Sequence, residues 1–369
     1  MKSRIGVFFA IIAFFTISCN EELKVYRIGA VIPLSGSLEA YGRYMKNGIT
    51  LALDEVNAAG GIKGKKLDVL FEDDTSTEKM AVTKAEELIK TPQVPVIIGG
   101  ATSNLTLAMA PVCEKNKVVL LSPAASSPKL SGIGQYIFRN YPSDTKEGKV
   151  MAEYAVRRMK IRTISIVYIQ NDYGQGLESI FKETFTGLGG VVSLEKPFPP
   201  NATDFVATVK ELKATPTDGI YVIGYYTEIA AFLQEIQKQK VTTKILSVEG
   251  VAQPMILEIA SEAAEGLIYP QPPYNPDSDD PAIQKFVAAY RAKFPTKPDL
   301  DAAFSYDALK IVAKAIEGCA NYPQDLRARI ADTNYKGITG DISFDAKGDV
   351  DITPRIFQIK DGKFEPVQY

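Results

Sequence analysis

Short apolar runs alternate with helical patterns in the first part of the chain. The runs of strand length span residues 27–32, 66–71, 94–98 and 118–121. Between them, apolar residues recur at intervals of three and four, as at Ile49, Leu53 and Val56, which is typical of a helix packed on one face. Further helices are predicted at residues 80–89 and 105–115. Strands separated by helices of this length predict parallel β-α-β units with right-handed crossovers.

The same pattern begins again further along the chain. Strands are predicted at residues 163–169, 191–194, 219–223 and 244–248, and helices at residues 177–188, 204–213 and 228–238. Tyr41-Gly42 and Tyr173-Gly174 occupy matching loop positions after the first strand of each half. Because 369 residues exceed what one hydrophobic core usually covers, we expect two similar α/β domains, each with a mostly parallel sheet flanked by helices.

The segment after residue 269 does not have the pattern of a third domain. Helices are predicted at 282–294 and 302–319. Residues 340–344 and 355–359 are expected to form a short antiparallel tail, with Lys347-Gly348 as its turn. Such a segment would cover the first half and then touch the second, so the chain would cross several times between the halves, as at a hinge.

The N-terminus has the features of an export signal. Lys2 and Arg4 precede an apolar run at residues 5–17, which is shorter than the roughly 20 residues that span a bilayer. We therefore predict a cleaved signal peptide at residues 1–18. Residues 16–19 resemble the lipobox of bacterial lipoproteins, so lipid on Cys19 would anchor the chain to a membrane. The alternative is an ordinary signal peptide with an incidental cysteine.

Composition excludes several kinds of chemistry. The net charge of −2 provides no basic surface for nucleic acid. Histidine is absent, which removes the commonest general base and metal ligand, so we expect no enzyme, no metal and no cofactor. Cys113 and Cys319 are expected to be buried small residues, with a disulfide as the alternative. Asp73-Asp74 is interpreted as a turn with two solvated acids rather than a cation site.

Four loops follow predicted strands, where ligands gather in parallel α/β sheets. The helix start at 99–104 includes Ser103, which could bind a carboxylate or simply cap the helix. Ser126, in the small-residue turn 122–127, offers a hydroxyl to a ligand close to the main chain. Tyr173 is a ligand contact or a packing residue, and Glu249 is a counter-ion for a cation or a solvated charge. The chain has neither a GxxxxGK[ST] run nor a GxGxxG helix start after its first strand, so nucleotide binding has little support.

At these residues the sequence resembles the leucine/isoleucine/valine-binding family of periplasmic solute-binding proteins. The resemblance covers residues 26–363, and its most specific motifs are 28–36, Tyr41-Gly42, 57–64 with Leu67, Asp73-Asp74, 122–125, 173–176, Glu249-Gly250 and 340–344. It implies the two-lobe periplasmic binding protein type I fold. The lobes expected on this basis are residues 24–143 plus 274–352 and residues 144–273 plus 353–369.

The resemblance also implies a ligand site. Ser103, Ser126 and the backbone at Ala124 would hold the α-carboxylate of an amino acid, and Glu249 with Tyr173 its α-ammonium. The side-chain pocket would be shaped by four residues: Tyr41, Ala101, Thr102 and Tyr225. The implied ligand is a small amino acid, branched-chain or otherwise apolar or aromatic. Small Ala101 leaves room for a larger ligand, and the Thr102 hydroxyl also admits a polar side chain.

Family membership further implies partners and location. The protein would deliver its ligand to the permease subunits of an ABC importer, by hinge closure, as a monomer in the periplasm or at the cell surface. Two alternatives stay open: a ligand-binding sensory receptor, and a binder of amides or urea with the same fold. The three polar residues Ser103, Ser126 and Glu249 together favour an α-amino acid.

Overall fold

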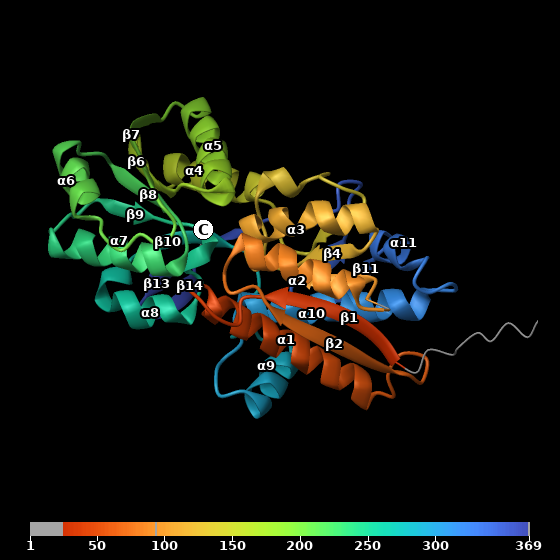
Figure 1. Ribbon diagram of the computed structural model, residues 1–369. Helices are drawn as coiled ribbons and strands as arrows, with labels where there is room; N and C mark the ends of the chain where they lie inside the picture. The colour runs from red at the N-terminus through yellow and green to blue at the C-terminus, as the bar shows by residue number, and fades with distance from the viewer. Residues whose placement is uncertain (1–24, 93, 368–369) are drawn as a thin grey trace, which may run out of the picture.

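The computed structural model describes residues 25–92 and 94–367, and two sheets organise this part of the chain (Figure 1). The first sheet is entirely parallel. Its five strands lie in the order β2 (Lys66–Asp73), β1 (Val25–Ile32), β3 (Val96–Gly99), β4 (Val119–Ser122) and β5 (Ile137–Arg139). The predicted parallel β-α-β units are therefore present in the first half.

Helices cover both faces of the first sheet. Helices α1 (Glu39–Ala58) and α10 (Leu300–Gly318) pack on the face to which Ile28 and Ile98 point, while α2 (Glu78–Lys90) and α3 (Ser103–Asn116) pack on the face of Val31 and Ile97. A Cβ on Gly48 of α1 would lie 2.1 Å from the carbonyl oxygen of Ala302, so only glycine permits this close approach to α10. Helices α9 (Pro281–Lys293) and α11 (Leu326–Ala331) pack beside α1 and α10.

The second sheet has seven strands and mixed direction. Their order is β14 (Lys363–Pro366), β13 (Arg355–Lys360), β10 (Ile268–Gln271), β9 (Lys244–Leu246), β8 (Gly219–Ile223), β6 (Thr163–Ile169) and β7 (Val191–Phe198). The strands from β10 to β7 are parallel, and β13 and β14 add an antiparallel edge. Five helices accompany this sheet: α4 (Asp144–Arg157) against α5 (Asp172–Gly187), and the row α6 (Val206–Ala214), α7 (Tyr226–Lys238) and α8 (Pro254–Ala260).

We call the elements packed on the five-stranded sheet the first lobe and those packed on the seven-stranded sheet the second lobe. The chain passes between the lobes after β5, after β10 and again before β13. Figure 1 shows α9 and α10, far along the sequence, returning to lie beside α1. The residue boundaries expected for the two lobes from the family resemblance stay a prediction.

The predicted antiparallel tail is wrong. Strand β12 (Gly340–Ser343) pairs with β11 (Asn334–Gly337) in a separate hairpin, whereas β13 pairs with β10 and β14 in the second sheet. Strand β12 pairs with β11 because a tight turn joins the two. Strand β13 pairs with β10 because β10 has an unpaired edge in the second sheet. The turn at Lys347-Gly348 is present, enclosed by a single bridge between Phe344 and Val350.

The acids after β2 also differ from the prediction of two solvated side chains. Asp73 accepts hydrogen bonds from Leu34 N (2.9 Å) and Ser35 Oγ (2.7 Å). Asp74 is fully buried and accepts one from Ser76 N (2.9 Å), and burial raises its pKa to about 7. These acids order the turn into α2. Within the described ranges, no group of histidine, cysteine, aspartate and glutamate side chains could hold a metal ion.

Cys113 and Cys319 are both buried and free, as expected, and lie in different hydrophobic clusters. No helix in residues 25–92 and 94–367 is both long and apolar enough to cross a membrane. The predicted signal peptide and Cys19 lie outside the described residues.

Candidate functional site

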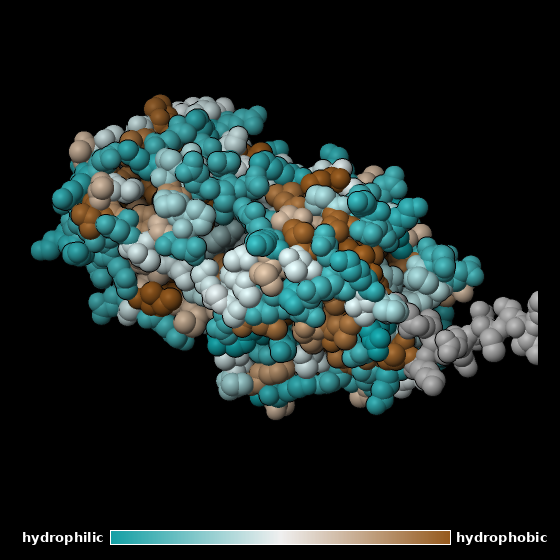
Figure 2. All heavy atoms as spheres, in the orientation of Figure 1, coloured by the Kyte–Doolittle hydropathy of each residue, from teal (hydrophilic) through white to brown (hydrophobic). Residues whose placement is uncertain are grey.

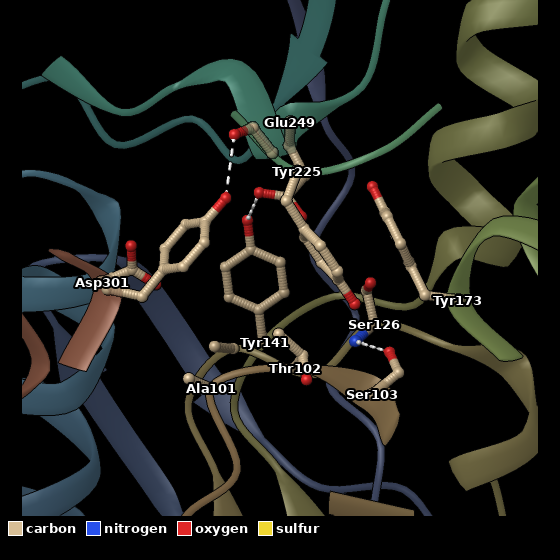
Figure 3. A pocket seen from close by; sticks show the side chains of 12 residues that line it. Ala101, Thr102, Ser103, Ser126, Tyr141, Tyr173, Tyr225, Glu249 and Asp301 are labelled. Atoms are coloured by element: carbon tan, nitrogen blue, oxygen red, sulfur yellow. Dashed lines mark hydrogen bonds between the residues drawn. The ribbon is translucent and has the colours of Figure 1, made fainter. Parts of the chain in front are cut away.

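A cavity of about 360 Å³ lies where the two lobes meet (Figure 3). The nine predicted ligand-binding residues all line it, together with Tyr141, Gly250 and Asp301. The predicted residues come from loops and helix starts in the first and second lobes: Tyr41, Ala101, Thr102, Ser103, Ala124, Ser126, Tyr173, Tyr225 and Glu249. The structure therefore brings the whole set into one place, and its binding roles stay predictions.

Ser103, the first residue of α3, presents a hydroxyl with a defined role. Its Oγ accepts hydrogen bonds from Ser126 N (3.3 Å) and Ser127 N (3.0 Å). A serine oxygen has two acceptor lone pairs, and both are used here. The hydroxyl hydrogen is thus the group of Ser103 that remains available as a donor. The residue is only 2% exposed.

The two loops of the first lobe are held rigidly against each other. Thr106 Oγ1 donates to the carbonyl of Thr102 (2.9 Å), and Ser122 Oγ donates to the carbonyl of Gly100 (3.1 Å) while accepting from Ala125 N (3.0 Å). Gly100 has φ +78°, and a Cβ there would lie 1.9 Å from Thr106 Oγ1. Only glycine therefore fits at this strand end, and the backbone around Ser103 and Ser126 is preorganised.

Two tyrosines reach the cavity by the same local device, one from each lobe. Tyr41 and Tyr173 lie in the first turns of α1 and α5, each followed by a glycine. A Cβ on Gly42 would lie 1.7 Å from the Pro33 carbonyl oxygen, and one on Gly174 would lie 2.1 Å from that of Ile169. The glycines let each helix start directly against the preceding strand or loop, which turns the tyrosine inward.

Tyr41 and Tyr173 were both predicted in loops, and both placements are wrong, because each lies within a helix. Helix α5 begins at Asp172, because Asn171 caps it by accepting a hydrogen bond from Gly174 N (2.9 Å). Asparagine is among the preferred N-cap residues. The Tyr173 ring stacks on that of Tyr225 with centroids 5.5 Å apart, and its buried hydroxyl has no hydrogen-bond partner in the described chain.

Glu249 lies at the top of the cavity, in a short 3₁₀ turn (Glu249–Val251) after β9 (Figure 3). Its Oε2 accepts a hydrogen bond from Tyr141 Oη (2.9 Å), and its backbone N–H donates to Glu147 Oε1 (3.2 Å). Burial raises the pKa of Glu249 to about 7, and the Tyr141 hydrogen bond acts in the opposite direction. None of the described residues that line the cavity is basic. The Glu249 carboxyl therefore has no basic side chain beside it in the described lining of the cavity.

Hydrogen bonds cross from one lobe to the other around the cavity. Tyr41 Oη donates to the Gly250 carbonyl (3.1 Å), and Tyr141, whose ring packs on Phe304 of the first lobe, donates to Glu249. These contacts exist only when the lobes are together, so the described conformation is a closed one. Figure 2 shows hydrophilic and intermediate residues over the junction of the lobes on the face in view.

Three lining residues were missed by sequence reasoning as individual site residues. Tyr141 follows β5, which ends in Arg139 and has no continuous apolar run, so no strand was predicted before this loop. Asp301 is the second residue of α10, whose predicted start at residue 302 was two positions late. The Pro298-Asp299 pair, a proline followed by an N-cap residue, is a signal that would have located this helix start.

The sequence matches the family described as periplasmic binding protein over residues 25–363. The chain belongs to that family. The Leu/Ile/Val-binding protein of Escherichia coli K12 is 30% identical over 346 residues, covering 92% of this chain and 91% of that protein. A leucine-, isoleucine-, valine-, threonine- and alanine-binding protein of Pseudomonas aeruginosa is 26% identical over 351 residues, covering 94% of this chain and 92% of that protein.

Solved structures of this family have the same fold. The leucine-binding protein LivK of Thermotoga maritima is 29% identical with a TM-score of 0.87, covering 93% of this chain and 97% of that one. LivJ of Streptococcus pneumoniae, solved in complex with isoleucine, is 29% identical with a TM-score of 0.87, covering 94% of this chain and 100% of that one. As a periplasmic binding protein, the chain is a solute-binding component that works outside the cytoplasm, with two lobes of the type I fold.

Proposed function

We propose that this periplasmic binding protein captures one α-amino acid between its lobes and delivers it to an ABC importer. One observation carries the proposal: the cavity presents donors on the first lobe and an acid on the second. Ser103 has only its hydroxyl hydrogen to offer, while Glu249 offers a carboxylate oxygen. A zwitterion has the complementary pair of charges about one small molecule apart.

The arrangement explains how binding would close the lobes. The ligand carboxylate would lie against Ser103, Ser126 and the backbone at Ala124, and its ammonium against Glu249 and Tyr173. Charge-assisted hydrogen bonds of this kind are roughly twice as strong as neutral ones. Because contacts to both lobes exist together only in the closed form, the ligand favours closure by its differential affinity. Tyr41, Ala101, Thr102 and Tyr225 would surround its side chain.

The proposal that an ABC importer is the partner rests on the family and not on the cavity. The relatives above are named as binding proteins for leucine, isoleucine and valine, and other solved relatives are named as parts of branched-chain amino acid ABC transporters. We propose the same partner here, with the protein acting as a monomer without enzymatic activity. Lipid on Cys19 would keep it at the membrane, which mass spectrometry of the protein from membranes, compared with a Cys19→Ala variant, would test.

Isothermal titration calorimetry with the common amino acids tests the ligand class. Glu249→Gln keeps the shape of the side chain but removes its charge, and we expect it to weaken the best ligand by at least ~2 kcal/mol. Asp218→Asn is a matched control, because Asp218 is an exposed acid that accepts from Arg162 N and Thr163 N on the same lobe, away from the cavity. Unchanged affinity in Glu249→Gln would rule out the ammonium contact, and binding of no amino acid would rule out the function.

A further inference from the structure

Asp301 is a second carboxyl in the cavity, and the proposed binding of an α-amino acid gives it no partner. It is 8% exposed and lines the cavity from the start of α10. Within residues 25–92 and 94–367, its carboxyl receives one hydrogen bond, from Gln253 Nε2 to Oδ2. Oδ1 therefore stays open to a donor supplied by a ligand.

The surroundings of Asp301 are short of donors. The Gln253 amide also donates to Asp299 Oδ2 (2.8 Å), so one side chain serves two buried acids. Burial, and then the neighbouring charges of Asp299 and Glu249, raise the pKa of Asp301. An incompletely solvated buried carboxylate is costly unless it is paired or hydrogen-bonded. In the absence of a partner the carboxyl tends to take up a proton, and a ligand donor at Oδ1 would instead favour its ionised form.

The buried charges of the described residues also leave Asp301 without a cationic partner. In the described ranges, the buried charged side chains are Asp74, Asp144, Glu147, Glu228, Asp299, Asp301, Asp307 and the single base Arg139. Arg139 pairs with Asp349 (2.7 Å), away from the cavity. A zwitterion with an apolar side chain would supply one ammonium, which Glu249 uses. Such a ligand would have no further cation or donor to pair with the Asp301 carboxyl.

The position of Asp301 matches the ligand side chain rather than the backbone. Figure 3 shows Asp301 at the opposite end of the cavity from Ser103, Ser126 and Tyr173, with Ala101 and the Tyr141 ring between them in the view and Glu249 above. An amino acid held by its carboxylate at Ser103 and its ammonium at Glu249 sends its side chain toward the remaining end. Ala101 takes up little space on that side, and the Tyr141 ring borders it.

We propose that Asp301 selects an α-amino acid whose side chain ends in a hydrogen-bond donor, namely a hydroxyl, amide or ammonium group, over the hydrocarbon of the same shape. This rests on the proposed function, because it takes the carboxylate and ammonium contacts as given. The site then recognises both ends of its ligand. Ser103 and Glu249 bind the ligand's α-carboxylate and α-ammonium, and Asp301 binds the end of its side chain. Sites built to bind a polar group discriminate strongly against an analogue that lacks it.

Calorimetry on the full-length chain, freed of co-purified ligand by unfolding and refolding, tests the proposal. The panel pairs threonine with valine, asparagine with leucine, and lysine with norleucine, alongside the other common amino acids. We expect the tightest ligand to end in a donor and to bind at least about tenfold more tightly than its hydrocarbon counterpart, a difference of about 1.4 kcal/mol. A smaller ratio, or a hydrocarbon as the tightest ligand, overturns the role of Asp301 and leaves the proposed function intact. Binding of no amino acid overturns both.

Two variants test whether Asp301 causes the preference for a ligand whose side chain ends in a donor. Asp301→Asn replaces the open acceptor with a group that also presents a donor, and it should lower the ratio at least about tenfold. Asp218→Asn is the matched control, because Asp218 undergoes the same acid-to-amide change but accepts from Arg162 N and Thr163 N away from this cavity. It should leave the ratio within about threefold. An unchanged ratio in Asp301→Asn overturns the proposal. If that variant does not fold, as judged by circular dichroism, the wild-type ratio decides alone.

Discussion

Removing the Tyr141 hydroxyl should open the closed form and weaken ligand binding. Tyr141→Phe deletes the hydrogen bond to Glu249 Oε2 (2.9 Å) but keeps the ring on Phe304, whose centroid is 4.7 Å away. A hydrogen bond to a charged group contributes about 1.5–3 kcal/mol. Because this bond joins the lobes only when they are closed, its loss reduces the affinity of the best amino-acid ligand by about 10- to 150-fold.

Two further tyrosine variants provide comparisons for the expected loss of affinity. Tyr41→Phe deletes a bond to a neutral acceptor, the Gly250 carbonyl (3.1 Å), which corresponds to about 0.5–1.5 kcal/mol and a loss of about 2- to 12-fold. Tyr221→Phe removes a buried hydroxyl that has no partner in the described chain, so affinity should change less than about twofold.

Titration calorimetry measures the three affinities, and small-angle X-ray scattering measures the compactness of the ligand-free protein. We expect the ligand-free Tyr141→Phe variant to have the larger radius of gyration. An affinity of Tyr141→Phe within twofold of the wild type, or a larger loss in Tyr221→Phe than in Tyr141→Phe, would refute the role of the Tyr141–Glu249 bond in closure.

Two predictions concern stability. Gly42→Ala should lower the free energy of unfolding by about 1–3 kcal/mol in chemical denaturation, because its Cβ would lie 1.7 Å from the Pro33 carbonyl oxygen. Gly187→Ala is the control: its Cβ meets open space, so the free energy of unfolding should stay the same or increase. Equal effects of the two substitutions would contradict this prediction. Burial raises the pKa of Asp144 to about 8 from 3.8, so the folded state binds this proton more tightly than the unfolded state. Stability from this group is complete below about pH 4 and is lost as the pH rises toward 8, by at most ~1.4 kcal/mol per pH unit. The melting temperature of Asp144→Asn relative to wild type should therefore rise between pH 5 and pH 8, and a constant difference would show that Asp144 is not so perturbed.

The longer elements could be predicted from the sequence because their pattern is local. Strands β6 and β8 have the predicted bounds, since each is a mostly apolar run rich in isoleucine and valine between polar turns. Strands β5 and β10 were not predicted, because Arg139 and Pro270 interrupt their apolar pattern. The partner of β13 could not be predicted either, because strand pairing is decided by which sheet edge is open in three dimensions.

The site shows the same division. Glu249 and Ser103 follow recognisable strands, so the loops that hold them could be identified in advance. Asp301 comes from a helix that reaches the cavity from the other end of the sequence, and its importance depends on Gln253 and Asp299 sharing one amide. No local pattern encodes that competition. The burial of Asp74 was missed for a similar reason, because its backbone N–H bonds to the Ile32 carbonyl of the neighbouring strand, a pairing that no local pattern shows.

The order of elements along the chain has a consequence for synthesis. The first sheet is complete at Arg139, but α10, which covers one of its faces, ends only at Gly318. The second sheet gains its last two strands at residues 355–366. A nascent chain emerging from its N-terminus therefore cannot finish either lobe until nearly all of it has been made. Until then the first sheet lacks the helix that covers one of its faces, and the second sheet lacks its antiparallel edge.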